Sequence, residues 1–482
     1  MKTFFTIWLG QLTSNIGSAL TGFALGVFIF QETESVTQFS LIWLCGMVPG
    51  TLIAPFAGVW VDRWDRRRIL IGADIVSALI TLALLLLLKA DQLEVWHILL
   101  GTSISAIAGA FQMPAFTASI QSLVAKEQFG RAAGMNQLGA GVGRLIGPPA
   151  SGFLLASIGM IGVVTIDFVT FFFAVGTLLL VHIPRAEKSE EGQKDAGSMW
   201  GEMKVPWRFM RERPGLMGMQ AFTVVMNLML ASSTVLLGPL VLSFTTPATM
   251  GVLFSMGGVG MIVGGLFMGA WGGPSRKVYG VMTFAIISML GLALVGLRPN
   301  PVLMGVGIAT FGFCMPIIMG CSQAIWLSKT PADIMGRVMS MRRMLITGVT
   351  PLGFLVSGPL ADKVFEPMMA ANGTVAQFFG PIIGTGPGRG MGLMLVFMGL
   401  TAALIAAICF VFPALRNVET LVPDTDNPAT PEMGMGGPGM RRRGGPGKGD
   451  KGGRRRMMKR RGAPHNTDTS PPAENDGPPT SE

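Results

Sequence analysis

Long apolar runs alternate with short polar segments along most of the chain. About twelve of these runs are long enough to cross a bilayer, for which a helix needs about 20 mostly apolar residues. They lie approximately at residues 4–30, 38–61, 69–89, 96–122, 132–156, 160–183, 217–242, 248–271, 278–298, 301–326, 344–361 and 391–412. The pattern predicts an all-α membrane protein with about 12 transmembrane helices, of which the run at 344–361 is the shortest and contains Pro351 and Pro359.

A long polar segment divides the predicted helices into two groups of six. The resulting organisation is a first six-helix bundle at 1–183, a cytoplasmic linker at 184–216, a second six-helix bundle at 217–412 and a basic tail at 413–482. The tail consists mainly of Pro, Gly and charged residues, with almost no aliphatic side chains. Because such a composition cannot bury a core, we expect the tail to be disordered.

A weak internal repeat supports the division into two halves. The segment Gly130–Met135 resembles Gly336–Met341, at an offset of 206 residues. The same offset aligns three positions of the predicted fifth helix with the eleventh: Gly147 with Gly353, Ser151 with Ser357, and Gly152 with Gly358. Some transporters are built from parallel repeats, with the substrate site near the middle of the membrane between the halves.

The charged residues are few and lie mainly between the apolar runs. They make up 13% of the chain, against about 25% in soluble domains. Basic residues cluster on one side of the predicted membrane, and the opposite side holds only Lys89, Arg298, Lys363 and Arg389. Because cytoplasmic loops are rich in Lys and Arg, we predict a multi-pass protein of the cell inner membrane with both termini in the cytoplasm.

The formal net charge of +10 comes largely from the tail, where eleven Lys and Arg residues lie between Arg441 and Arg461. A basic excess confined to loops and a tail argues against a nucleic-acid partner. The tail cluster either contacts anionic lipids, with about 1 kcal/mol per basic residue near the surface, or is a solvated segment that reinforces the topology.

The sequence lacks the residue patterns of an enzyme. Its four cysteines lie singly in apolar runs, with no CxxC pair and no Cys/His cluster, so neither a metal site nor a disulfide framework is expected. No GxxxxGK[ST] loop is present, which argues against an ATP-driven pump. We therefore expect no cofactor and assign no catalytic residue.

The loop between the predicted second and third helices has the most distinctive pattern. It reads Gly58-Val-Trp-Val-Asp62-Arg63-Trp-Asp65-Arg66-Arg67-Arg68. A glycine lets helices approach closely, and an aspartate among arginines can form a charge network that breaks and reforms when the halves move. On the alternative interpretation the arginines only fix the topology, but that role does not require Gly58 and Asp62 at this spacing.

A second pattern lies in the predicted fifth helix. It reads Gly143-Arg144-Leu-Ile-Gly147-Pro148-Pro149-Ala-Ser151-Gly152. Small residues four positions apart let membrane helices pack closely, and proline removes a helix hydrogen bond and bends the helix. We therefore interpret Gly143, Gly147, Pro148 and Gly152 as a helix-packing motif.

Both segments resemble signature sequences of the major facilitator superfamily. The loop from Gly58 is similar to its gating loop, and the segment from Gly143 is similar to its antiporter motif. The segments Phe4–Gln11, Pro55–Val59 and Met135–Gln137 resemble the macrolide-efflux branch of the superfamily. The resemblance implies the major facilitator fold and a proton-driven exporter of a hydrophobic or amphipathic compound.

Three ionisable residues inside predicted helices are functional candidates, because such residues usually face a cavity or a partner. Arg144 and Asp167 lie at depths within about 10 Å of each other, at 1.5 Å per residue. We predict that Asp167 takes part in proton coupling and that Arg144 pairs with it or adjusts its proton affinity. The alternative is a purely structural Arg–Asp bridge. Asp74, near the cytoplasmic end of its helix, is assigned to the gate.

Polar residues in the first predicted helix form a stripe at helical spacing: Gln11, Asn15 and Ser18. With Asn227 of the seventh helix as the counterpart in the other half, Gln11 and Asn15 are predicted to line the substrate cavity. Alternatively, these side chains form hydrogen bonds between helices, which is common in membrane bundles.

Taken together, the patterns predict a secondary active transporter that works by alternating access, and the resemblance implies that it exports a small amphipathic or hydrophobic compound in exchange for protons. We expect it to act as a monomer in the lipid bilayer. Two alternatives stay open: import of a small metabolite, and a membrane receptor or assembly protein that does not transport.

Overall fold

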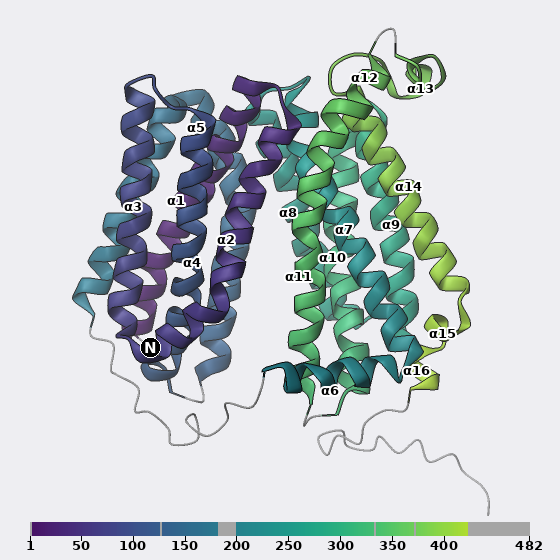
Figure 1. Ribbon diagram of the computed structural model, residues 1–482, viewed down its shortest axis with the longest axis horizontal. Helices are drawn as coiled ribbons and strands as arrows, with labels where there is room; N and C mark the ends of the chain where they lie inside the picture. Colours follow the sequence, from purple (N-terminus) through teal and green to yellow (C-terminus); the bar gives the residue numbers. More distant parts are fainter. Residues whose placement is uncertain (1, 126–127, 182–198, 332–333, 371–372, 423–482) are drawn as a thin grey trace, which may run out of the picture. The chain divides into compact units, whose positions relative to one another are not determined.

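The computed structural model describes residues 2–125, 128–181, 199–331, 334–370 and 373–422 (Figure 1). Within these ranges every regular element is helical, and eleven helices are long and apolar enough to cross a membrane. The elements are α1 (Lys2–Thr33), α2 (Val36–Arg63), α3 (Arg66–Lys89), α4 (Val95–Leu123), α5 (Phe129–Leu180), α6 (Met199–Arg211), α7 (Pro214–Leu242), α8 (Pro247–Trp271), α9 (Lys277–Leu297), α10 (Pro301–Lys329), α11 (Met335–Leu360), the π-helix η3 (Ala361–Phe365), α12 (Glu366–Met369), α13 (Ala376–Ile383), α14 (Arg389–Val411), α15 (Pro413–Arg416) and α16 (Val418–Leu421). The predicted all-α membrane fold is confirmed.

Helix α5 contains two membrane crossings, which accounts for the difference between eleven long helices and twelve predicted runs. Gly159 interrupts it with φ +69° and ψ −179°, a backbone conformation that is essentially restricted to glycine. Near one end of α5, the indole of Trp8 donates a hydrogen bond to the carbonyl oxygen of Met135 (3.0 Å). Near the other end of α5, Thr177 packs against Gly10, which lies in the same turn of α1 as Trp8. The two parts of α5 therefore run back along each other as a hairpin.

The described residues belong to one compact unit, Met1–Asn427, and its helices form two groups. Helices α1 to α5 pack on one another, and α7 to α14 do the same. We call the helix ends near Arg66 and Arg337 the basic face, and the ends near Ser35 and Asp362 the far face. In Figure 1 the far face is at the top and the basic face, with α6, is at the bottom.

The two groups touch mainly through two helix pairs, α5 with α8 and α2 with α11. One hydrophobic cluster joins them and includes Val27 and Phe39 from the first group and Leu236 from the second. Phe23 and Phe254 meet edge to face across the boundary, with ring centroids 6.3 Å apart. Because these residues lie in the parts of their helices near the far face, the contact between the two groups is concentrated near the far face. Figure 1 shows α2 and α11 separating towards the basic face.

The predicted linker contains the amphipathic helix α6. Phe209 and Met210 are buried against the second group, whereas Trp207 and Arg208 are exposed. Glu212 accepts a hydrogen bond of 2.7 Å from Arg208 and thereby raises the pKa of that guanidinium. Helix α6 is therefore attached to the second group along one face.

The predicted tail began at residue 413, and this boundary is wrong, because the chain stays folded through α15 and α16. Val418 is buried in a cluster of the second group. Glu419 accepts hydrogen bonds from the backbone amides of Lys277 and Val278, both at 3.0 Å, and so caps the start of α9. The amine of Lys329 donates to the carbonyl oxygens of Glu419 and Val422. The predicted disorder and lipid contact of the remaining tail concern residues outside the described ranges.

Candidate functional site

The contact between α5 and α8 is built from glycines on both helices. A Cβ at Gly152 would lie 2.6 Å from the carbonyl oxygen of Pro247, and a Cβ at Gly251 would lie 2.6 Å from the carbonyl oxygen of Pro148. Both distances are well inside van der Waals contact, and both neighbours are backbone atoms that cannot rotate away. Only glycine at these two positions permits so close an approach of the halves.

The other residues of the same segment of α5 have different surroundings. A Cβ at Gly147 would lie 3.0 Å from the Cβ of Ala19 on α1, whereas one at Gly143 would meet no atom within 4 Å. The hydroxyl of Ser151 donates to the carbonyl oxygen of Leu20 at 2.7 Å. The predicted packing motif thus serves two neighbours, with Gly147 against α1, and Pro148 and Gly152 against α8.

The contact between α2 and α11 repeats this arrangement in the other half. A Cβ at Gly358 would lie 2.6 Å from the Cα of Thr37 and 2.8 Å from the hydroxyl oxygen of Ser40. The offset of 206 residues relates Gly358 to Gly152. Gly152 packs against the first turn of α8, and Gly358 packs against the first turn of α2. The two halves therefore meet at two equivalent places on the far face.

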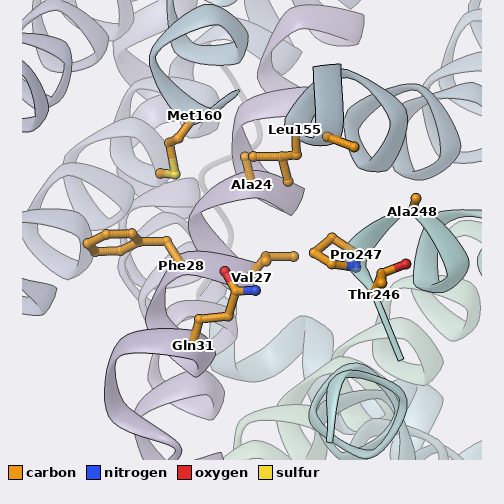
Figure 2. Close-up of a pocket in the computed structure, with 10 residues that line it drawn as sticks. Ala24, Val27, Phe28, Gln31, Leu155, Met160, Thr246, Pro247 and Ala248 are labelled. Atoms are coloured by element: carbon orange, nitrogen blue, oxygen red, sulfur yellow. The ribbon is translucent and has the colours of Figure 1, made fainter. Parts of the chain in front are cut away.

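A cavity of about 470 Å³ lies beside the α5–α8 contact. It is lined by residues of α1 and α5 and by the start of α8, and Figure 2 shows these side chains around it. Its walls are mostly apolar, with Val27, Phe28 and Met160 among them, and Gln31 and Thr246 supply polar groups. The volume falls within the roughly 300–1,000 Å³ that is usual for small-molecule sites.

A buried carboxyl joins three helices of the first half near the basic face. Asp74 of α3 is 1% exposed. Its two oxygens accept hydrogen bonds from the amide of Gln11 on α1 (2.9 Å) and the amide of Gln112 on α4 (2.6 Å). Gln112 also donates to the side-chain oxygen of Gln11 at 3.0 Å. Gln11, predicted to line the cavity, is therefore buried in this cluster.

A second buried carboxyl lies in the returning part of α5. Asp167 is 2% exposed and accepts a hydrogen bond of 3.3 Å from the hydroxyl of Ser18 on α1. Gly17 lets α1 approach, since a Cβ there would lie 2.8 Å from a carboxyl oxygen of Asp167. Ser18 and Asn15 are exposed on α1. One hydroxyl thus separates the Asp167 carboxyl from the exposed side of that helix.

The arginines that follow the loop connect α3 to other helices of its own half. Arg66 donates to the carbonyl oxygen of Ala118 on α4 at 2.8 Å. The guanidinium of Arg67 donates to the carbonyl oxygens of Leu178 (2.9 Å) and Leu179 (2.8 Å) at the end of α5. These bonds give the two arginines structural partners in addition to their positive charge.

Several predicted site residues lie partly outside what the structure describes. The surroundings of Gly58 and the side chains of Asp62, Arg63 and Arg144 are outside the described residues, so the predicted charge network and the predicted Arg144 pairing stay predictions. Asp65, by contrast, accepts hydrogen bonds from the backbone amides at the start of α3 and caps that helix.

Asn227 of α7 makes its hydrogen bonds within the second half. Its amide donates to the carbonyl oxygen of Ile346 (2.9 Å) and to the hydroxyl of Thr350 (2.8 Å), both on α11. In this state it connects two helices, as the alternative interpretation of the polar residues proposed.

Two residues of the buried polar clusters, Gln112 and Arg342, do not stand out in the sequence. Gln112 was visible only as one polar residue in an apolar run. Arg342 lies just before the predicted run at 344–361, but it is 8% exposed. Its guanidinium donates to the side-chain oxygen of Gln220 at 3.2 Å and lies 4.2 Å from the ring centroid of Trp326. In both halves, therefore, a buried charged group is bound by a glutamine of the first helix of that half: Asp74 by Gln11, and Arg342 by Gln220.

The family of the chain follows from a comparison with family models. The model of the Major Facilitator Superfamily matches residues 7–354. The chain belongs to the major facilitator superfamily. The resemblance noted from its loop and its fifth helix is thus confirmed, and the protein is a transporter rather than an enzyme.

Relatives within the superfamily include efflux proteins. The chain is 27% identical to macrolide efflux protein A of Streptococcus pyogenes over 367 residues, covering 75% of this chain and 90% of that protein. It is 22% identical to the multidrug efflux pump Tap of Mycolicibacterium fortuitum over 369 residues, covering 74% of this chain and 88% of the pump.

Solved structures of superfamily-like transporters share the fold. A bacterial homolog of the human lysosomal transporter Spinster, in an inward-facing and unoccupied conformation, matches with a TM-score of 0.64 and 14% identity, covering 86% of this chain and 97% of the other. The nucleoside transporter NupG matches with a TM-score of 0.59 and 14% identity, covering 86% of this chain and all of the other (100%).

Proposed function

We propose that this major facilitator transporter exports a small amphipathic compound in exchange for protons, by alternating access. Two kinds of named relative, macrolide efflux protein A and the multidrug pump Tap, are efflux proteins, and the alignment covers 90% of the former's length. The observation that supports proton coupling is the buried Asp167 carboxyl, which accepts a hydrogen bond from the exposed Ser18.

Asp167 has the surroundings that a proton-carrying group needs. An intramembrane carboxyl is expensive to keep and usually marks a proton or substrate pathway. Among the described side chains none forms an ion pair with it, and it accepts a hydrogen bond there from the Ser18 hydroxyl. A proton that arrives at the exposed side of α1 can pass through the Ser18 hydroxyl to the carboxyl.

Asp74 serves a different purpose in this proposal. Its carboxyl is bound by two glutamines from two other helices, whereas Asp167 is bound by the hydroxyl of Ser18. We assign it to the gate at the basic face, where it fixes the relative positions of α1, α3 and α4 near Arg66 and Arg67.

The orientation follows from the placement of charge. The basic face, which carries Arg66, Arg337 and the arginines of α6, is assigned to the cytoplasm of the cell inner membrane, with both termini on that side. The far face is then outside. A state whose halves touch near the far face is inward-facing, ready to take up a compound from the cytoplasm or the inner leaflet.

The substrate class is a neutral or weakly charged amphipathic molecule. The cavity beside α8 has apolar walls with an amide at Gln31 and a hydroxyl at Thr246. Such a lining suits a ligand with a large apolar surface and a few hydrogen-bonding groups. We place this cavity on the exit path, since it lies at the far face.

Transport by everted membrane vesicles tests the proposal. Vesicles that contain the protein, energised to be acidic inside, should accumulate a radiolabelled macrolide and release protons when it is added. Vesicles with Asp167→Asn should still bind the compound but lose the accumulation driven by the pH gradient. Asp91→Asn, a change of the same chemistry at an exposed position between α3 and α4, is the matched control and should behave as the parent.

Three results would contradict the proposal. Uptake that runs in the opposite direction under the same gradient would indicate an importer. Asp167→Asn vesicles that accumulate the compound as well as the parent would remove Asp167 from the proton pathway. No movement of any amphipathic compound across a broad panel would exclude the substrate class.

A further inference from the structure

The end of α11 reaches across the boundary between the halves and caps the start of α2. Asp362, in the π-helix η3, accepts hydrogen bonds from the backbone amides of Val36 and Thr37, both at 2.9 Å. It also accepts one from the hydroxyl of Ser35 at 2.8 Å. All three donors belong to the first half, whereas Asp362 belongs to the second.

This cap supplies what the first turn of α2 lacks. The first amides of a helix have no partner within the helix and carry partial positive charge, so a carboxylate there forms strong, charge-assisted hydrogen bonds. The hydroxyl of Ser35 accepts from the amide of Gln38 at 3.3 Å, which leaves the amides of Val36 and Thr37 for Asp362. Gly358, one turn earlier on α11, brings the two backbones close enough for these bonds to form.

The equivalent place in the other half has no such bond. The offset of 206 residues carries Asp362 onto Ala156, which lines the cavity beside the start of α8. There the first helical residue is Pro247, which has no amide hydrogen to donate, and Thr246 caps the amide of Thr249 (Figure 2 shows this end of α8). Of the two equivalent contacts at the far face, one is bonded by a carboxylate and the other borders a cavity.

A comparison within η3 and α12 shows what is special about Asp362. Glu366, one turn further along, accepts hydrogen bonds from the amides of Gly388 (3.2 Å) and Met391 (2.9 Å) at the start of α14. That cap lies within the second half and is unaffected by movement between the halves. The cap made by Asp362 must break whenever α2 and α11 part.

We propose that Asp362 is the latch of the far-face gate: its bonds to the first turn of α2 hold the halves closed there, and the transporter opens to that side only by breaking them. The proposal rests on the alternating access proposed above, but it concerns the gate alone and requires neither a particular substrate nor proton coupling.

Cysteine accessibility measures the gate directly. Ser40 is 2% exposed at the α2–α11 contact, and Ser40→Cys is nearly isosteric, so a cysteine there reports opening. The reporter is placed in a chain whose Cys45, Cys314, Cys321 and Cys409 are replaced by alanine. The purified protein in lipid nanodiscs, without substrate or gradient, is treated with a membrane-impermeant maleimide and the labelling rate is measured.

Two variants break the latch from opposite sides. Asp362→Asn keeps the shape but removes the charge. Val36→Pro removes one donor from the first helical position of α2. Proline is well tolerated at that position, and α8 already has Pro247 there. Ser35 has the extended backbone (ψ 121°) that a following proline requires. Each should raise the labelling rate by roughly fivefold to thirtyfold, the range expected for one or two strong hydrogen bonds.

The double variant and two controls decide the result. Because both changes break one interaction, the double variant should label much more slowly than the product of the two single effects predicts. Lys363→Gln and Glu366→Gln, in the same segment, should label at the parental rate. Three outcomes would each overturn the proposed latch. These are parental labelling rates in folded Asp362→Asn and Val36→Pro, fully multiplicative effects in the double variant, and an equal increase with Lys363→Gln. None of these outcomes would change the result of the vesicle experiment on export.

Discussion

The close contact between α5 and α8 allows a single added methyl group to shift the transport equilibrium. In Gly152→Ala the new Cβ would lie 2.6 Å from the carbonyl oxygen of Pro247 and 3.1 Å from the Cα of Ala248. Comfortable separations between heavy atoms of this kind are about 3.5–4.0 Å. Since both neighbours are backbone, the helices must move apart by several tenths of an ångström in the far-closed state.

The size of the effect follows from this overlap. Inserting a methyl group into a well-packed contact destabilises it by about 1–3 kcal/mol. The methyl is free of Pro247 once the halves separate, so the penalty falls on the far-closed state alone. A difference of about 1–3 kcal/mol corresponds to a shift of about 5–150-fold in the equilibrium between the two states.

The assay is the labelling rate of the Ser40→Cys reporter, which lies at the other helix pair, α2 with α11. The matched control is Gly143→Ala in the same helix, where the added Cβ meets no atom within 4 Å. Both changes add the same helix propensity, so only the contact with α8 distinguishes them. We expect faster labelling with Gly152→Ala and the parental rate with Gly143→Ala.

Equal labelling rates for Gly152→Ala and Gly143→Ala would refute the reasoning. That outcome would mean that the α5–α8 contact yields without opening the far face, and that the halves do not move as rigid groups. A slower rate with Gly152→Ala would mean that the added methyl group strengthens the contact by filling space.

The buried polar contacts give three further expectations. Gln112→Leu removes the amide that donates to Asp74 and should lower the stability of the purified protein by about 1–3 kcal/mol, measured by thermal unfolding in detergent. The control is a substitution to leucine at an exposed position of α4. Arg67→Lys keeps the charge but loses the paired hydrogen bonds to the end of α5, so we expect about 1–2 kcal/mol lower stability with unchanged topology. No change in stability would favour a purely topological role for Arg67. Lys329→Met removes the donor to the last carbonyls of α16, so limited proteolysis should cut residues 413–422 faster, while the long helices stay protected.

The bilayer made most of the fold predictable. A membrane-spanning helix has to satisfy its own backbone groups and present apolar side chains to lipid, so hydropathy alone located the runs that became α1 to α5, α7 to α11 and α14. Even the hairpin in α5 agrees with the two predicted runs, because Gly159 falls between them. The boundary at residue 413 was wrong because α15 and α16 are too short and too polar for a hydropathy pattern to detect.

The site was less predictable because its partners come from distant parts of the sequence. Asp74 and Asp167 stood out as charges in apolar runs, but nothing in the sequence indicated that Gln112 would bind the first or that Ser18 would bind the second. Asp362 was ordinary by pattern, since it lies at the end of an apolar run where charged residues are common. Its role depends on the start of α2, which only the packing of the halves brings to it.

The attachment of the last short helices has a practical consequence for work with shortened forms of this transporter. Removing everything after the last apolar run would delete Glu419 and expose the amides at the start of α9 and the amine of Lys329. The damage would reach the second half although no membrane-spanning residue had been touched. A stop codon or an affinity tag belongs after Val422, where the chain has made its last described contact with the body of the protein.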